Sequence, residues 1–249
     1  MIVFVFEYYL SDMNPLLLEY LTILFWYIVP CFCAGLIVLF IRFVLKPEDY
    51  VYRKVLHICA VSTILCFILP ASTWWISVLD ILTILFLINV TLLILERTKL
   101  YPMLFIDKSH HEILKMINVY YIIMAAIVAL FFGGFGNSNK YLAVAAIMAW
   151  GVGDAAAAII GHKIGKNKYK TSFFDNNKSI EGTLAMLVSS FLITVLVLAL
   201  TMDYPINQIL VESLVISIIL SLIEATTKNG LDNVFCPIAA STILLLFTL

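Results

Sequence analysis

Long apolar stretches that repeat along the whole chain constrain its fold more than any other feature. About eight of them can be read in the 249 residues, each near the length that crosses about 30 Å of hydrocarbon. They run over residues 16–45, 55–69, 74–95, 114–133, 141–162, 182–201, 208–225 and 232–249. Only 12% of the residues are charged, whereas soluble domains have about 25%. The sequence therefore predicts an all-α fold, a polytopic integral membrane bundle of about eight transmembrane helices.

The second stretch is the shortest, because its apolar part ends at Pro70. It can span a membrane only if residues from about Tyr50 onward belong to it, and without it the count falls to seven. Every lysine and arginine except Lys140 lies in alternate loops, which fits eight spans. Since positive loops stay in the cytosol, we expect both termini outside and any site at the basic helix ends facing the cytosol.

One cluster of polar and small residues interrupts the apolar pattern. Asp154 follows two glycines, and on a helix it would share one face with Ala157, Gly161 and Gly165, at steps of three, four and four. A carboxylate beside small residues, with lysines following, suits a polyphosphate bound with Mg²⁺. The alternative is a small-residue stripe for helix packing. Asp154 argues against the second interpretation, because a carboxylate gains nothing from a packing seam.

A basic and acidic pair precedes the sixth stretch. Lys178 and Glu181 would lie one helical turn apart, and Ser179 stands only two residues before Glu181, which does not fit a capping box. Glu181 could instead simply complement the helix dipole. The lysines between the fifth and sixth stretches could equally form a solvated loop that faces anionic lipids; they are Lys163, Lys166, Lys168 and Lys170.

A second constellation precedes the second stretch, where His57 lies one turn beyond Arg53 and Lys54. Three such groups would suit a phosphate clamp. Anchoring by the positive-inside rule explains the two cations almost as well, but it does not require His57.

A third constellation lies between the last two stretches, where Glu224 is followed by Asp232, Asn233 and Pro237. Asp232 or Asn233 could merely cap the last helix. Glu224 is harder to explain structurally, because it lies near the inner end of an apolar span.

Together these residues resemble a known family. The pattern Asp154-x-x-Ala157-x-x-x-Gly161-x-x-x-Gly165, followed by Lys178-Ser-Ile-Glu181-Gly182, resembles the CTP-binding motif of the membrane lipid-alcohol kinases: dolichol kinase, phytol kinase and the CTP-dependent diacylglycerol kinase of fungi. The elements Arg53-Lys-x-x-His57 and Asp232-Asn-x-x-x-Pro237, with Glu224, are similar to two further motifs of that family. The match covers residues 53–237 in the expected order.

Two departures from the family pattern concern the nucleotide. Asn177 stands where the family usually has a lysine, and the gap after Gly165 is about three residues longer than usual. The first removes a positive charge, so the preference for CTP over another nucleotide is left open.

The resemblance implies one membrane-embedded kinase domain over residues 1–249, with its site at helix ends in 53–57, 151–182 and 224–237. Such a kinase transfers the γ-phosphoryl group of CTP to the hydroxyl of a membrane lipid alcohol and needs no nucleic acid. It implies metal ligands for Mg²⁺ among Asp154, Glu181, Glu224 and Asp232. It implies His57 or a carboxylate as base, and nucleotide contacts from Arg53, Lys54, Gly153, Ala157, Gly161, Lys163, Gly165, Lys178, Ser179, Gly182 and Asn233.

Two other functions remain open at this point. A phosphatidate cytidylyltransferase also uses CTP, Mg²⁺ and a lipid, but its Pro-Gly-His-Gly-Gly run is absent here. A small transporter or flippase would explain Asp80 and Glu212 as parts of a route across the bilayer, or these acids could only snorkel or pair. The acceptor also stays open among polyprenols such as dolichol, phytol-type prenols and diacylglycerol.

Overall fold

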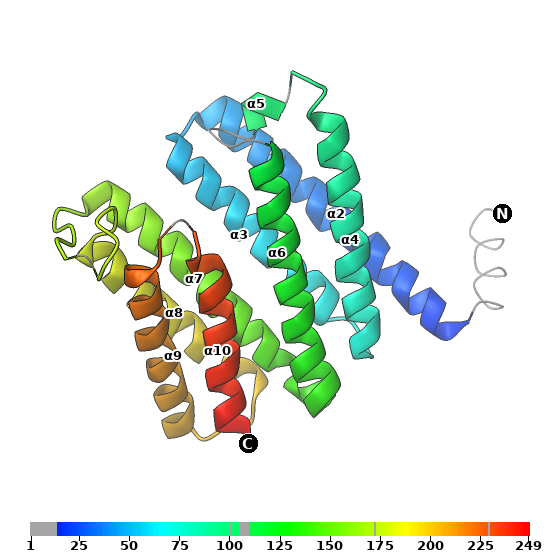
Figure 1. Cartoon of the computed structure of the whole chain (residues 1–249). Helices are drawn as coiled ribbons and strands as arrows, with labels where there is room; N and C mark the ends of the chain where they lie inside the picture. The colour runs from blue at the N-terminus through cyan, green and yellow to red at the C-terminus, as the bar shows by residue number, and fades with distance from the viewer. Residues whose placement is uncertain (1–13, 100, 105–109, 172, 229) are drawn as a thin grey trace.

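A computed structural model describes residues 14–99, 101–104, 110–171, 173–228 and 230–249 (Figure 1). Its helices are α2 (Pro15–Phe40, extended by the π-helical turn η1, Ile41–Leu45), α3 (Asp49–Ile68), α4 (Trp74–Leu95), the short α5 (Tyr101–Leu104), α6 (His110–Val128, extended by the π-helical turn η2, Ala129–Gly133), α7 (Lys140–Ile164), α8 (Ile180–Thr201), α9 (Ile206–Thr226) and α10 (Asp232–Thr248). In these ranges the only β-structure is an isolated bridge between Lys168 and Ser179.

The predicted all-α membrane bundle is confirmed. Seven of the described helices are long and apolar enough to cross a membrane, and their limits follow the predicted stretches closely. The doubtful second span exists because α3 begins at Asp49, so the residues around Tyr50 do belong to it. The eighth stretch forms α10, an apolar helix of 17 residues, or about 25 Å at 1.5 Å per residue.

Helix α7 lies at the centre of the bundle. It is the most buried of the seven long helices, and it packs against α3, α8 and α10 (Figure 1). Helix α2 lies at the periphery against α3 and α4, and most of its large apolar side chains are exposed, as expected for a surface in hydrocarbon. Because α7 is central, residues in its C-terminal half contact three other helices.

The closest helix contact joins α7 to the start of α8, and small residues make it possible. A Cβ atom on Gly182 would lie 2.8 Å from the carbonyl oxygen of Ala157 and 3.2 Å from the Cα atom of Gly161. Any larger side chain would push the two backbones apart. The predicted small-residue face therefore exists, and its partner is α8.

Gly182→Ala is expected to destabilise the protein by about 2 kcal/mol, the usual cost of overpacking a close contact. Gly35→Ala serves as the control, since a Cβ there meets nothing within 4 Å and alanine is the better helix former. Thermal unfolding in detergent should show a lower midpoint only for Gly182→Ala. Equal midpoints for the two variants would contradict the close contact.

The basic residues that the structure describes lie at one end of the bundle, with a single exception, as the sequence predicts. The described basic residues other than Lys140 lie on or beside the ends gathered at the top and upper left of Figure 1. Lys140 lies at the opposite end, where its ammonium donates to the carbonyl oxygens of Leu69 at 2.9 Å and Ala71 at 3.1 Å. Lys140 thus binds free carbonyl groups at the end of α3, which explains the exception to the charge pattern.

The cytosolic orientation of the basic ends is tested by cysteine labelling in cells. Lys170→Cys and Asn137→Cys place a thiol at an exposed residue of each end. An impermeant reagent should label Asn137→Cys and should leave Lys170→Cys unlabelled until the membrane is opened. The unsubstituted chain, with its own five cysteines, provides the background. Labelling of Lys170→Cys from outside would reverse the predicted topology.

Candidate functional site

Asp154 lies at the centre of the first half of the site. Its Oδ2 atom is 2.7 Å from the ammonium nitrogen of Lys54 and 3.4 Å from Nε2 of His57. The carboxylate comes from α7, and both partners come from α3, one turn apart, so they present their side chains on the same face. Only 8% of the Asp154 side chain is exposed. The predicted convergence of the 53–57 and 151–182 segments is therefore present.

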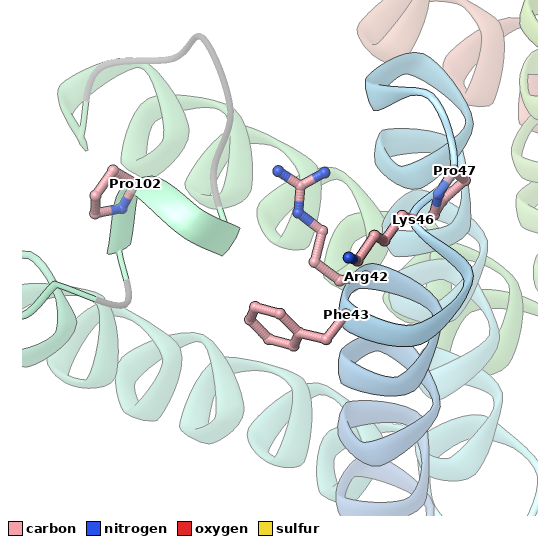
Figure 2. A pocket seen from close by; sticks show the side chains of 5 residues that line it. All are labelled: Arg42, Phe43, Lys46, Pro47 and Pro102. Carbon is pink, nitrogen blue, oxygen red and sulfur yellow. The ribbon is translucent and has the colours of Figure 1, made fainter.

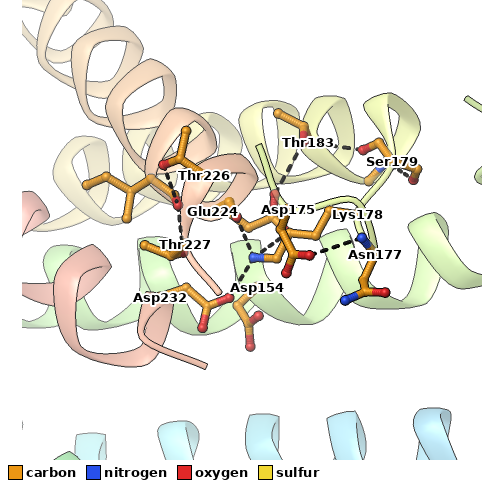
Figure 3. A network of polar contacts seen from close by, with 12 residues as sticks. Asp154, Asp175, Asn177, Lys178, Ser179, Thr183, Glu224, Thr226, Thr227 and Asp232 are labelled. Atoms are coloured by element: carbon orange, nitrogen blue, oxygen red, sulfur yellow. Dashed lines mark hydrogen bonds and ion pairs between the residues drawn. The ribbon is translucent and has the colours of Figure 1, made fainter. Parts of the chain in front are cut away.

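Lys178 holds the second half of the site together (Figure 3). Its ammonium lies 3.2 Å from Oε1 of Glu224 and 2.9 Å from Oδ2 of Asp232, and it also donates to the backbone carbonyl of Glu224. Burial opposes the charge of Lys178, but the two carboxylates outweigh burial and raise its pKa above the usual value. Lys178 is therefore a fixed cation whose three donors are all engaged within the protein.

The two halves lie side by side and carry more acid than base. Figure 3 shows Asp154 close to the Lys178 network, and electrostatic interactions link Asp154 with both Lys178 and Glu224. Three buried acids lie here, namely Asp154, Glu224 and Asp232. Only two lysines, Lys54 and Lys178, face them. The remaining negative charge suits a further cation.

The acids are suited to sharing a metal ion with a ligand, and they do not form a complete site on their own. Among the described residues, no three His, Cys, Asp or Glu side chains lie close enough together to hold a metal ion. Mg²⁺ usually takes one or two carboxylates, with phosphates and waters as its other ligands. Asp154 and Asp232 fit that requirement, because each is buried at the site and each has only a lysine ammonium as its close cationic partner, apart from His57.

Glu181 does not join this group, and its predicted relation to Lys178 is wrong. Helix α8 begins at Ile180, after the N-cap Ser179, so Lys178 precedes the helix and the two side chains diverge. The Glu181 carboxylate accepts from the backbone N–H of Asn167 at 3.2 Å and from its side-chain amide at 2.8 Å. Glu181 thus fixes the loop between α7 and α8.

The small residues of the motif serve the helix contact. Gly161 and Gly165 meet Ser179, whose hydroxyl accepts from the backbone N–H of Gly182. Gly153 faces Met186 and Ser190 of α8. The helix-packing interpretation is therefore what the structure shows for these glycines and for Ala157, and α8 occupies the space beside them where nucleotide contacts were predicted.

Three other predicted contacts point away from the two halves. Arg53 is exposed, next to the half-buried Lys54. Lys163 is exposed and follows Asp154 by about two and a half turns, so it projects from the opposite face of α7. The side-chain amide of Asn233 donates to the carbonyl oxygen of Gly230 in its own turn. Neither Arg53 nor Lys163 has a described ion pair with the site residues, and Asn233 contacts them only through its backbone N–H, which donates to Oδ1 of Asp232 at 3.0 Å.

Several residues around the site were not predicted from the sequence. The Thr183 hydroxyl contacts Oε2 of Glu224 at 3.3 Å and receives a hydrogen bond from Tyr169 at 3.1 Å, so it steadies the carboxylate. Trp150 stands about one turn before Asp154 on the same face of α7, a spacing that could have identified it. Tyr120 has no such signal, because nothing local connects it to the motifs.

A cavity of about 480 Å³ lies elsewhere, between η1 and α5 (Figure 2). It is lined by Arg42, Phe43, Lys46, Pro47 and Pro102. None of the predicted site residues lines it.

The two acids that suggested a transport route lie within the bundle near its other end. Asp80 and Glu212 are 0% and 1% exposed, so neither snorkels to the surface. Glu212 accepts from the amide of Gln208 at 2.6 Å. Glu212 is thus hydrogen-bonded through one oxygen, while its Oε2 and both oxygens of Asp80 lack a hydrogen-bond partner within the described structure.

A comparison with curated proteins finds a similarity over part of the chain. A stretch of 97 residues is 35% identical to the phytol kinase of Synechocystis sp.. This stretch is similar to a phytol kinase. It covers 39% of this chain and 40% of that protein, so the chain spans about two fifths of the relative's length. No family model and no solved structure matches the chain.

Proposed function

We propose that this protein is a Mg²⁺-dependent kinase that transfers the γ-phosphoryl group of CTP to the hydroxyl of a membrane lipid alcohol. The observation that carries the proposal is the meeting of Lys54 and His57 with Asp154, beside the Lys178 network, at one end of a membrane bundle. These residues come from parts of the sequence far apart. Partial similarity to a phytol kinase supports a prenol-type alcohol as acceptor.

The site residues have separate tasks in this reaction. The lipid oxygen forms a bond to the γ-phosphorus, the bond from that phosphorus to the bridging oxygen breaks, and CDP leaves. Lys54 neutralises phosphate charge, and His57 accepts the hydroxyl proton through Nε2, which makes no hydrogen bond in the described structure. Phosphoryl transfer depends chiefly on such positioning and charge neutralisation.

The acids and Lys178 prepare the nucleotide side of the site. Asp154 and Asp232 are the residues that would hold Mg²⁺, which neutralises the polyphosphate when bound. Lys178 keeps Glu224 and Asp232 in place. A direct contact between Lys178 and a phosphate requires it to exchange one of its present acceptors.

The test is transfer of radiolabel from γ-labelled CTP to purified protein supplied with phytol, farnesol, geranylgeraniol, dolichol or diacylglycerol. ATP, GTP and UTP run beside CTP, and removal of Mg²⁺ by a chelator is a control. We expect a labelled monophosphate of a prenol that depends on Mg²⁺. Release of pyrophosphate with a CDP-lipid product would instead identify a cytidylyltransferase, and no lipid product with any nucleotide would overturn the kinase.

A further inference from the structure

Three polar atoms beside the site lack a hydrogen-bond partner although protein surrounds them. They are Nε2 of His57, Nε1 of Trp150 and the hydroxyl oxygen of Tyr120, each buried with no hydrogen bond within the described structure, although Nε2 of His57 lies 3.4 Å from Oδ2 of Asp154. Trp150 is 0% exposed. An unpaired buried donor carries a desolvation cost that a bound acceptor removes. Their presence in one place indicates a site for a small polar group.

The three side chains form one cluster across three helices. The rings of His57 (α3) and Trp150 (α7) meet edge to face, with centroids 5.0 Å apart. The ring of Tyr120 (α6) lies 5.3 Å from that of Trp150. Trp150 therefore touches both the proposed base and the tyrosine.

The cluster lies on the hydrocarbon side of the charged site. Trp150 is about one turn deeper in the bundle than Asp154, and His57 is about one turn deeper than Lys54. Helix α6 packs mainly on α4 and α10 rather than on α3 or α7. Val119 and Ile58, next to Tyr120 and His57 in sequence, are exposed apolar side chains. A group approaching from the membrane would meet this cluster before the charges.

We propose that Trp150 and Tyr120 bind the hydroxyl oxygen of the lipid alcohol and present it to His57. This inference rests on the proposed function and assigns its acceptor subsite. The indole N–H is a donor only, and the phenol can donate. Once the hydroxyl proton passes to His57, the oxygen has three lone pairs. Two accept from Trp150 and Tyr120, and the third forms the bond to the γ-phosphorus.

A binding measurement tests the subsite without relying on the kinase activity. Phytol should raise the thermal unfolding midpoint of the protein in detergent more than the matched hydrocarbon without the hydroxyl. Tyr120→Phe and Trp150→Phe should abolish this difference, because each removes one donor. Tyr121→Phe is the matched control, since the Tyr121 hydroxyl interacts with Tyr27 and Thr63 rather than lacking a partner; it should lower the midpoint without ligand and keep the difference.

Kinetics give the second readout. Tyr120→Phe should raise the KM for the lipid alcohol about fivefold, the loss of one ordinary hydrogen bond, and leave the KM for nucleotide unchanged. If the protein distinguishes alcohol from hydrocarbon through Tyr120 but transfers no phosphate, the subsite stands and the kinase proposal fails. If the kinase is active while Tyr120→Phe matches the wild type in both assays, or if alcohol and hydrocarbon act alike on the wild type, the inference is overturned.

Discussion

Asp154→Asn should abolish phosphoryl transfer, with kcat at least about a thousandfold lower, while the protein still folds. Asparagine keeps the size of the side chain but removes the charge that Lys54 and a metal ion require. Electrostatic groups at a transferring phosphate commonly contribute factors of about 10²–10³, and Asp154 would serve both Lys54 and the proposed metal ion. The measurement is label transfer at saturating CTP and lipid, beside thermal unfolding in detergent.

Asp203→Asn is the matched control, because Asp203 is an exposed acid in the turn between α8 and α9 at the opposite end of the bundle. It should behave like the wild type. Retained activity in Asp154→Asn would reduce Asp154 to a structural partner of Lys54. Loss of the folded protein would show that the ion pair is required for stability, and Asp154→Glu would then test the chemistry with the charge kept.

Lys178→Met should lower both stability and kcat. It leaves Glu224 and Asp232 buried without their cation, and breaking a buried ion pair costs about 3–5 kcal/mol. We expect a lower unfolding midpoint and a kcat about a hundredfold lower. Lys170→Ala changes an exposed loop lysine and should leave both quantities unchanged.

A double variant separates the two roles of Lys178. Lys178→Met with Asp232→Asn removes one charge of each sign, so much of the lost stability should return. Activity should not return, because the site still lacks the cation and one proposed metal ligand. Recovery of activity together with stability would show that Lys178 acts on the fold alone.

The membrane bundle could be predicted from the sequence because each span is determined by one continuous run of residues. About 20 apolar residues in a row satisfy both the length and the solvation demanded by hydrocarbon. The limits of α4 and α8 agree with the predicted stretches. Helix α3 begins at Asp49, before the predicted apolar stretch, and this earlier start was the condition under which the second span could exist. Spacing along the helix also predicted that Lys54 and His57 would share a face.

The site could be predicted only where residue type and spacing were sufficient. Asp154, Lys54 and Lys178 are charges that an apolar chain retains for a reason, and all three lie at the site. Glu181 carries the same negative charge as Asp154, yet it binds Asn167 in a loop whose path no periodicity describes. The role of Tyr120 could not be predicted from the sequence, because aromatic side chains are common in apolar helices and its position depends on how α6 packs.

The glycine contact between α7 and α8 explains how the site tolerates a change in loop length. Lys178 is carried at the start of α8 by backbone that touches α7 through Gly161 and Gly182, while the loop between them is tied back at Asn167 and Lys168. The distance from Lys178 to Asp154 is thus set by two helices in van der Waals contact. Extra residues in the loop can extend outward and leave that distance unchanged, so a longer loop would add surface without moving Lys178 relative to Asp154.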